Sequence, residues 1–359
     1  MAKRIAAGVV FLVYSSSQIV IKRLINIATH RLVTLPVLVL MPHSRCNCRC
    51  VMCDIWKANS NKQEITTENL EKHLPAFKKL GVKHVALSGG EALMHTNLWK
   101  FCALLKSIGI RISLLTTGVS LKVHAENVIA WCDDVIVSLD GGRERHNQIR
   151  NIPHAFEKLE EGVARLKVLK PEFRVTGRTV LQKMNFRDFP DIVTTARTLG
   201  LDQISFLAAD VSSSAFNRPA PWEDDKVVQI ELNATEADEF ESILRTSFTE
   251  FKTLYQQKFI AESRQKMLSL VQYYRAILGA TDFPGKVCNA PWVSAVIESD
   301  GEVRPCFFHP SFGNIHEHSL TEIINTPAAV AFRKNLNMKE DKTCQRCVCS
   351  LHIGLRKRV

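Results

Sequence analysis

The chain has 359 residues, of which 46% are hydrophobic and 23% are charged, a composition typical of a globular protein with a large core and not of a disordered chain. Lysine and arginine outnumber aspartate and glutamate by 47 to 36, which gives a net charge of +11, but the excess lies at the two ends of the chain and forms no stripe. We therefore expect no nucleic acid partner, and instead a contact between the basic ends and a surface such as a membrane.

Residues 1–34 form the first segment, which is basic and has no acidic residue. At helical spacing, one face of this segment is apolar and most polar side chains lie opposite. The apolar face consists of Ile21, Leu24, Ile25, Ala28 and Leu32. Such a helix is typical of an element lying on a membrane surface, so we expect peripheral membrane contact; a helix that covers the open end of the barrel is the alternative. A membrane-spanning helix over 5–21 is a third interpretation, although a polar stretch at 15–18 interrupts it.

The apolar stretch 5–14 lacks the small-residue cleavage site of a secretory signal. We therefore expect a cytoplasmic protein, located at the inner membrane surface if the first helix binds there. The chain has eleven cysteines, an odd number that cannot all pair. In a reducing compartment, clustered cysteines indicate metal binding and not disulfides.

Residues 35–209 alternate between apolar runs and amphipathic stretches. The runs predict strands at 35–41, 83–87, 111–116, 134–139, 174–181 and 203–207. The amphipathic stretches predict helices at 66–80, 97–108, 121–131, 155–169 and 189–199. Short connections between them indicate a parallel sheet with right-handed crossovers. Six units are too few for a full eight-unit barrel, so we predict an α/β fold with a partial (β/α)6 barrel, with an open doubly wound sheet as the alternative.

A cysteine-rich loop follows the first strand. In it, Cys46, Cys50 and Cys53 have the spacing C-x3-C-x2-C, which allows three thiolates to bind one [4Fe-4S] cluster. Three ligands leave one iron open, and that iron can bind a small molecule. Zinc, with Cys48 as a fourth ligand, is the alternative.

This loop, with Asp54, Ile55 and Trp56 after it, resembles the cluster loop of the radical S-adenosylmethionine (SAM) superfamily. The resemblance covers about residues 35–207. It implies that the reduced cluster cleaves SAM to a 5′-deoxyadenosyl radical, which abstracts a hydrogen atom from the substrate. The implied electron donor is a reductant such as ferredoxin or flavodoxin.

The superfamily's further motifs follow in order at the ends of later strands. By this resemblance, the residues that bind SAM are Gly89, Gly90, Glu91, Thr117, Ser138, Asp140 and Arg178. Paired glycines let backbone approach a ligand, and Glu91 can accept a hydrogen bond from an ammonium group. Asp140 before two glycines also suits a plain turn, and an ion pair with a nearby acid would explain Arg178 equally well. The chain departs from the usual pattern at Ala92, where proline is common, and at Thr117, where asparagine is usual.

The composition changes after residue 209. We predict four units: a basic amphipathic segment at 1–34, the barrel at 35–209, a loop and helical linker at 210–285, and a cysteine-rich domain at 286–359. Cys288, Cys306, Cys344 and Cys347 resemble the ligands of the SPASM extension, which implies one auxiliary [4Fe-4S] cluster. No cysteine follows Cys349, so the extension is truncated and a second auxiliary cluster is not expected. Cys349 could replace Cys347 as a ligand, and a zinc ribbon is the alternative.

Together these features predict a radical SAM enzyme, without assigning a catalytic role to any side chain. The substrate classes open to it are a small molecule, a lipid and a peptide. The basic N-terminal helix favours a lipid or membrane-associated substrate, and a peptide- or protein-modifying maturase is the alternative within the superfamily. A non-catalytic iron-sulfur or zinc scaffold is the alternative from another class of protein.

Overall fold

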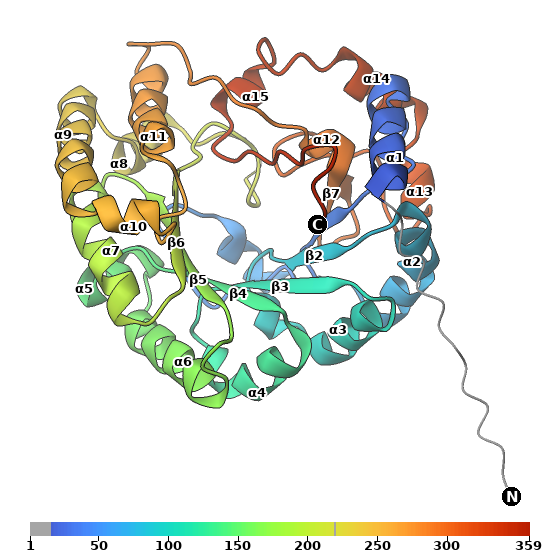
Figure 1. Cartoon of the computed structure of the whole chain (residues 1–359), viewed down its shortest axis with the longest axis horizontal. Coiled ribbons are helices and arrows are strands. Elements are labelled where there is room, and N and C mark those ends of the chain that lie inside the picture. Colours follow the sequence, from blue (N-terminus) through green and yellow to red (C-terminus); the bar gives the residue numbers. More distant parts are fainter. Residues whose placement is uncertain (1–15, 219) are drawn as a thin grey trace, which may run out of the picture.

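A computed structural model describes residues 16–218 and 220–359, and the strands in these ranges form one curved sheet (Figure 1). The strands are β1 (Val37–Leu40), β2 (His84–Leu87), β3 (Arg111–Thr116), β4 (Asp134–Ser138), β5 (Val175–Leu181), β6 (Gln203–Ala208), β7 (Ser294–Ile297) and β8 (Val303–Arg304). Their order is β6-β5-β4-β3-β2-β1-β7-β8, with β8 antiparallel to β7 and the other pairs parallel. The predicted α/β fold with a partial (β/α)6 barrel is therefore confirmed.

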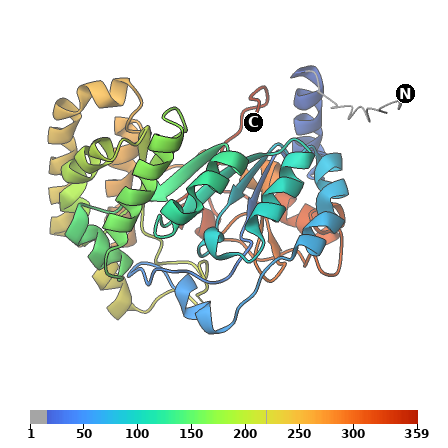
Figure 2. The ribbon, with the colours of Figure 1, turned by 90° about the horizontal axis from the view of Figure 1, so that it is seen from below.

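Helices cover the outer face of this sheet, while the inner face is turned toward the tail of the chain (Figures 1 and 2). The outer helices are α2 (Thr67–Leu80), α3 (Leu98–Ser107), α4 (Leu121–Trp131), α6 (Ala155–Leu169) and α7 (Phe189–Thr198). Alternation along each strand separates the two faces. In β5, for example, Val175 and Leu181 belong to the hydrophobic core, whereas Arg178 lies on the opposite side.

Local sequence signals explain where the predicted helices begin and end. Helix α2 starts after Thr66, whose hydroxyl accepts a hydrogen bond from the backbone N–H of Asn69. It ends at Gly81, which has a left-handed φ of 66°. Between these caps, Leu70 and Phe77 are buried against the sheet side of the helix.

Helix α5 (Arg143–Arg150) was not predicted, because its sequence is polar and lacks an apolar period. It forms because tertiary contacts bury His146, Ile149 and Arg150. Three short 3-10 helices also connect larger elements: η1 (Ile55–Ser60), η2 (Ala92–Met94) and η3 (Phe186–Asp188).

The linker and tail complete the molecule with short and medium helices. They are α8 (Asp224–Ile230), α9 (Ala234–Glu250), α10 (Lys252–Gln256), α11 (Arg264–Ile277), α12 (Ala290–Val293), α13 (Leu320–Ile323), α14 (Pro327–Asn335) and α15 (Lys342–Arg346). Strand β7 pairs with β1 in parallel, and all four of its residues are buried. The tail therefore extends the barrel sheet, which the sequence did not predict, because strand pairing across 250 residues leaves no local signal.

Helix α1 (Ser16–Thr29) lies at the periphery, beside α14 in Figure 1. Arg23 and Asn26 are buried, whereas Ile21, Leu24 and Ile25 of the predicted apolar face are exposed. Leu32, the last member of that predicted face, lies beyond the end of the helix and is buried in the core. The candidate spanning stretch 5–21 falls largely on residues 1–15, which lie outside the described residues. Within the described ranges, no helix is both long and apolar enough to cross a membrane.

Candidate functional site

The cysteine-rich loop after β1 is held from two sides by hydrogen bonds. The backbone N–H groups of Arg49 and Val51 each donate to a carbonyl at the end of α5, at 3.0 Å. The side-chain amide of Asn59 bonds both the N–H and the carbonyl of Cys46, at 2.9 Å each. These hydrogen bonds anchor the loop to α5 and to the segment that follows it.

The charges of the loop thiols suit a metal site. Burial raises the pKa of Cys46 and, to about 12, that of Cys53, and the neighbouring Cys50 adds to both shifts. A hydrogen bond from the Cys48 thiol lowers the pKa of Cys50, against the effect of burial. Thiolates that repel one another in a buried loop are stabilised by a cation, so Cys46, Cys50 and Cys53 fit the predicted cluster.

Two glycines at the end of β2 let this loop approach closely. A Cβ on Gly90 would lie 2.1 Å from the carbonyl oxygen of Arg45, and Gly89 has a φ of +104°. Any other residue would push the cysteine-rich loop away from the sheet. The next residue, Glu91, donates its backbone N–H to the same Arg45 carbonyl at 2.8 Å.

The Glu91 side chain is fully buried and joins the ends of β2 and β3. Its Oε2 accepts hydrogen bonds from the backbone N–H and the hydroxyl of Thr117, both at 2.7 Å, and from the Thr116 hydroxyl at 3.0 Å. The Thr117 hydroxyl also lies 2.9 Å from Oδ1 of Asn47 in the cysteine-rich loop. Burial raises the pKa of Glu91, although these hydrogen bonds oppose the shift. A ligand ammonium would have to share this carboxylate with the two threonines.

A buried ion pair connects the end of β4 to the same loop. The Arg150 guanidinium pairs with Asp140, and its Nη1 donates to Sγ of Cys50 at 3.5 Å. The Asp140 backbone N–H donates to Nδ1 of His146 at 3.2 Å. Burial raises the pKa of Asp140 even though Arg150 opposes the shift. Asp140 therefore supports Cys50, a predicted cluster ligand, through Arg150, a link that sequence reasoning missed.

Ser138 and Arg178 are direct neighbours on adjacent strands, β4 and β5. The Arg178 side chain points to the inner side of the sheet, with Nε 3.4 Å from the Ser205 hydroxyl. Arg178 forms no ion pair among the described residues, but its charge opposes the rise that burial causes in the pKa of Glu262, so the alternative of a nearby acid stays open. The other predicted SAM-binding residues lie at the ends of neighbouring strands, and their contacts with SAM stay predictions.

The tail cysteines converge on one cavity of about 570 Å³. Its lining includes all five, namely Cys288, Cys306, Cys344, Cys347 and Cys349. Burial raises the pKa of Cys306 to about 11 and that of Cys344 to about 12, and the nearby Cys288 adds to both shifts. As in the first loop, these thiols fit a cluster or another metal, and the choice between Cys347 and Cys349 stays open.

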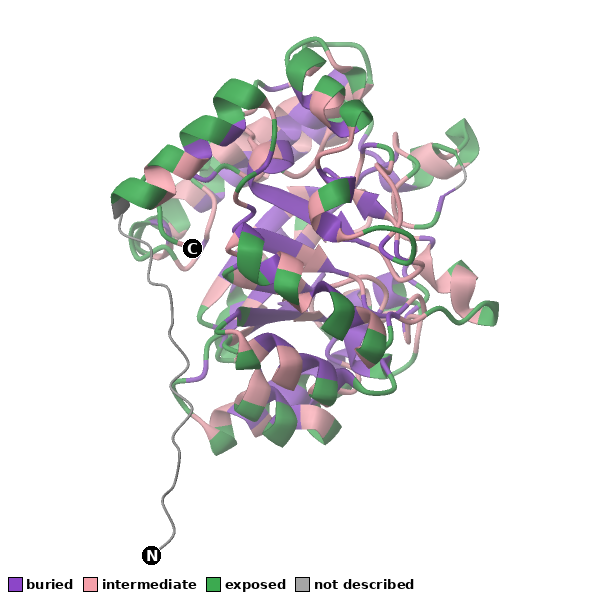
Figure 3. Ribbon diagram, turned by 90° about the vertical axis from the view of Figure 1, so that its right-hand side faces the viewer, coloured by how far each residue is buried: buried purple, intermediate pink, exposed green. Residues whose placement is uncertain are grey.

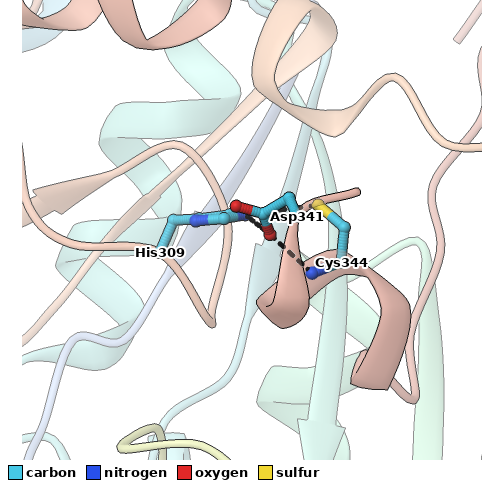
Figure 4. Close-up of side chains that lie close together, drawn as sticks. All are labelled: His309, Asp341 and Cys344. Carbon is cyan, nitrogen blue, oxygen red and sulfur yellow. Dashed lines mark hydrogen bonds and ion pairs between the residues drawn. The ribbon is translucent and has the colours of Figure 1, made fainter. Parts of the chain in front are cut away.

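His309 and Asp341 stand beside one of these thiols (Figure 4). Nε2 of His309 lies 3.3 Å from Sγ of Cys344 and 3.6 Å from Oδ1 of Asp341. Asp341 also caps α15, because its Oδ1 accepts from the Cys344 backbone N–H at 2.7 Å. Sequence reasoning missed both residues; the only signals were a histidine three positions after Cys306 and an acid three positions before Cys344.

The cavity extends from the tail thiols along the inner face of the sheet. It reaches Ser88, one residue before the paired glycines, and Arg178. Apolar side chains from the strands line it at Val37, Val39, Leu115 and Ile136. Cationic side chains line it at Arg111, Arg178, Lys286, Lys357 and Arg358. No aspartate or glutamate side chain of the described residues belongs to this lining.

Comparisons with known families match both regions of the chain. The model of the radical SAM superfamily matches residues 40–196, which hold the first cysteine loop and the strand ends described above. The model of the SPASM iron-sulfur cluster-binding domain matches residues 288–348, which include four of the five tail cysteines and end before Cys349.

Several characterised proteins are similar over most of the chain. An AdoMet-dependent heme synthase from Methanosarcina barkeri is 27% identical over 83% of this chain and 83% of its own length. A PqqA peptide cyclase from Methylobacterium nodulans is 24% identical over 84% of this chain and 76% of its own. The structure of Streptococcus suis SuiB bound to precursor peptide SuiA aligns with a TM-score of 0.61 and 13% identity, covering 90% of this chain and 73% of SuiB, which shows a shared fold.

Proposed function

The chain belongs to the radical SAM superfamily and carries a SPASM-like iron-sulfur domain, and on this premise we propose that it abstracts a hydrogen atom from a carboxylate-bearing peptide. It is an enzyme that uses SAM and [4Fe-4S] clusters. When bound, these cofactors supply a 5′-deoxyadenosyl radical for the abstraction. What we propose is the class of substrate and the side chains that bind it.

The observation that carries the proposal is the charge of the cavity. Five cationic side chains and no acidic side chain line it within the described residues, and much of the remaining lining is apolar. Arg111 lies 3.3 Å from Asp134, and the charge of Arg178 opposes the rise that burial causes in the pKa of Glu262, so at least two of these cations have an acidic neighbour. Such a lining favours an amphipathic substrate that carries a carboxylate.

The position of the cavity supports the same role. A substrate there would lie between the predicted SAM-binding strand ends and the tail thiols. We assign Arg178 and Lys286 to binding the substrate carboxylate, because both reach the cavity near its thiol-lined end. For Arg178 this proposal replaces the SAM contact that the sequence predicted. Val39, Leu115 and Ile136 would exclude water from the reacting carbon.

A peptide is the class that the relatives favour together with this geometry. The PqqA peptide cyclase is similar in sequence, and SuiB, which was crystallised with a precursor peptide, has a similar fold. None of the three proteins compared above is named for a lipid substrate, so the lipid expected from the N-terminal helix gives way to a peptide in this proposal. A ferredoxin or flavodoxin is the proposed electron donor.

A carboxylate-bearing tetrapyrrole is the second candidate. The heme synthase from Methanosarcina barkeri shows 27% identity over 83% of both chains. Heme precursors are apolar rings with carboxylate side chains, so they match the same cavity lining.

The test uses the anaerobically reconstituted protein with SAM and dithionite. Two pools of random octapeptides that differ only in a fixed central glutamate or glutamine are compared by the 5′-deoxyadenosine formed above the peptide-free background. We expect the glutamate pool to stimulate formation, and Arg178→Gln to reduce that stimulation roughly tenfold or more, as for loss of a charge-assisted contact. Arg174→Gln is the matched control, because Arg174 lies just before β5 and bonds Gln203 away from the cavity.

Equal stimulation by both pools, or an unchanged response in Arg178→Gln, would contradict the carboxylate proposal. Stimulation by Fe-coproporphyrin III with no response to either peptide pool would identify the second candidate instead.

A further inference from the structure

Helix α1 is attached to the protein through its polar face. The Arg23 guanidinium Nη1 donates to the carbonyls of Gly354 and Lys357 at 2.6 and 2.7 Å. The Asn26 side chain donates to the carbonyls of Thr34 and Trp292 at 2.7 and 2.9 Å. Both side chains are buried, at 4% and 1% exposure. This is the reverse of the usual amphipathic surface helix, which buries its apolar side.

The apolar face of α1 is therefore left facing outward. Its side chains are 56% exposed at Ile21, 47% at Leu24, 38% at Ile25 and 48% at Ile27. Val33, just after the helix, is 39% exposed. In Figure 3 the outward side of the helix that joins the grey trace is green, in agreement with these values. We call these five residues the α1 surface.

The fold also brings the two basic ends of the chain together beside this surface. The hydrogen bonds of Arg23 hold the backbone at 354–357, so the exposed Arg356 and Lys357 lie next to α1. Arg31 is exposed after the end of the helix. The sequence separates these cations by more than 300 residues, and only the tertiary structure places them at one site.

We propose that the α1 surface docks on a lipid bilayer that contains anionic headgroups. Charge complementarity selects this occupant: Arg31 and Arg356 are exposed beside the α1 surface, and residues 1–35 hold no acid. Residues 1–15, which precede α1, continue the pattern with Lys3, Arg4 and an apolar run to Tyr14. An anionic bilayer offers a negative layer directly above hydrocarbon, which matches cations surrounding an apolar face. This inference does not depend on the substrate proposed above, because it does not need Lys357 and Arg358, which line the cavity.

The test measures co-sedimentation of the full chain with phosphatidylcholine vesicles, with or without 30% phosphatidylglycerol. We expect binding to the anionic vesicles that weakens as salt rises, because the cationic contribution is screened. Leu24→Ser with Ile25→Ser should weaken binding roughly tenfold or more, since two exposed apolar side chains no longer enter the bilayer. Val123→Ser with Val168→Ser is the matched control, because these side chains are 79% and 73% exposed on α4 and α6.

Absence of binding to anionic vesicles would overturn the proposal. So would a dimer that the Leu24/Ile25 substitutions dissociate without any vesicle binding, because the occupant would then be a second copy. Deleting residues 1–15 shows whether that segment is what binds the vesicles. Binding retained after the deletion supports the α1 surface. Binding that is lost on deletion but unaffected by the Leu24/Ile25 substitutions would assign vesicle binding to residues 1–15.

Discussion

At the scale of single residues, buried polar side chains of the site are held in place by hydrogen bonds and an ion pair with other buried side chains. The Glu91 carboxylate accepts hydrogen bonds from Thr116 and Thr117, and the Thr117 hydroxyl also bonds Asn47 in the cysteine-rich loop. A separate series of contacts joins Asp140 to Arg150 by an ion pair and Arg150 to Cys50 by a hydrogen bond. These two series of contacts attach the cysteine-rich loop to the ends of β3 and β4. A substitution in either series is therefore expected to affect cluster binding as well as stability.

Replacing Glu91 with Gln should weaken SAM binding. The substitution keeps the shape but removes the negative charge that we expect an ammonium to contact, a contribution of about 1.5–3 kcal/mol. Isothermal titration of SAM into the reconstituted protein measures the effect, and Glu68→Gln, at the exposed start of α2, is the control. Affinity equal to that of the control would remove Glu91 from the SAM site and leave it the structural role seen in its threonine contacts.

Asp140 and Arg150 should behave as one unit in unfolding experiments. Arg150→Met leaves Asp140 buried without its partner, and we expect a loss of about 3–5 kcal/mol in the free energy of unfolding. Asp140→Asn should also destabilise, and the double variant should lose less than the sum of the two. Urea titrations of the four proteins give the coupling, and additive losses would show that the ion pair is not a unit.

At the scale of elements, the barrel strands and outer helices could be predicted because each has a local signal. The apolar runs gave β3 at 111–116, and Thr66 and Gly81 marked the ends of α2. Helix α5 was missed because Arg143–Arg150 is polar, and it is buried by tertiary packing on α6 and by contacts with the loop that it supports. Strand β7 was missed because its partner β1 is remote in sequence. The candidate SAM-binding residues stay predictions, and the sequence did not indicate that Glu91 and Asp140 would have protein partners.

The end of α8 carries a carboxyl group that should make stability depend on pH. Burial raises the pKa of Glu231 to about 7, and its Oε1 has no hydrogen-bond partner among the described residues. The folded state therefore binds a proton more tightly than the unfolded state, so this group lowers stability as pH rises from about 4.5 to 7. We expect Glu231→Gln to raise the free energy of unfolding by roughly 1–3 kcal/mol at pH 8 and to have little effect at pH 4.5. Equal effects at both pH values in urea titrations would contradict the assignment.

At the scale of the whole molecule, the tail closes one side of the barrel and brings a second set of thiols to the cavity. Strand β7 continues the sheet at β1, and the five tail cysteines line the space on its inner side. The N-terminal helix shows the limit of prediction at this scale. Its two faces were predicted from the sequence, but the side that packs on the protein depends on the carbonyls at 354–357, which no local pattern reveals.

The two sets of cysteines, one in the loop after β1 and one in the tail, should bind iron independently. Four irons on Cys46, Cys50 and Cys53 and four on the tail predict about eight irons per chain. Changing those three cysteines to Ala should leave about four irons per chain. Cys48→Ala should leave all eight, because we assign Cys48 as a hydrogen-bond donor to Cys50 and not as a cluster ligand. Iron and zinc analysis of the reconstituted proteins decides this, and stoichiometric zinc at the tail would contradict the auxiliary cluster.

The measurement that tests the central claim most directly is the formation of 5′-deoxyadenosine from SAM. The reconstituted protein is incubated anaerobically with SAM and dithionite, beside the variant in which Cys46, Cys50 and Cys53 are Ala. We predict 5′-deoxyadenosine and methionine in equal amounts from the unmodified protein and none from the variant, although the variant keeps its tail iron. An unmodified protein that is loaded with iron at both sites and forms no 5′-deoxyadenosine would contradict the account.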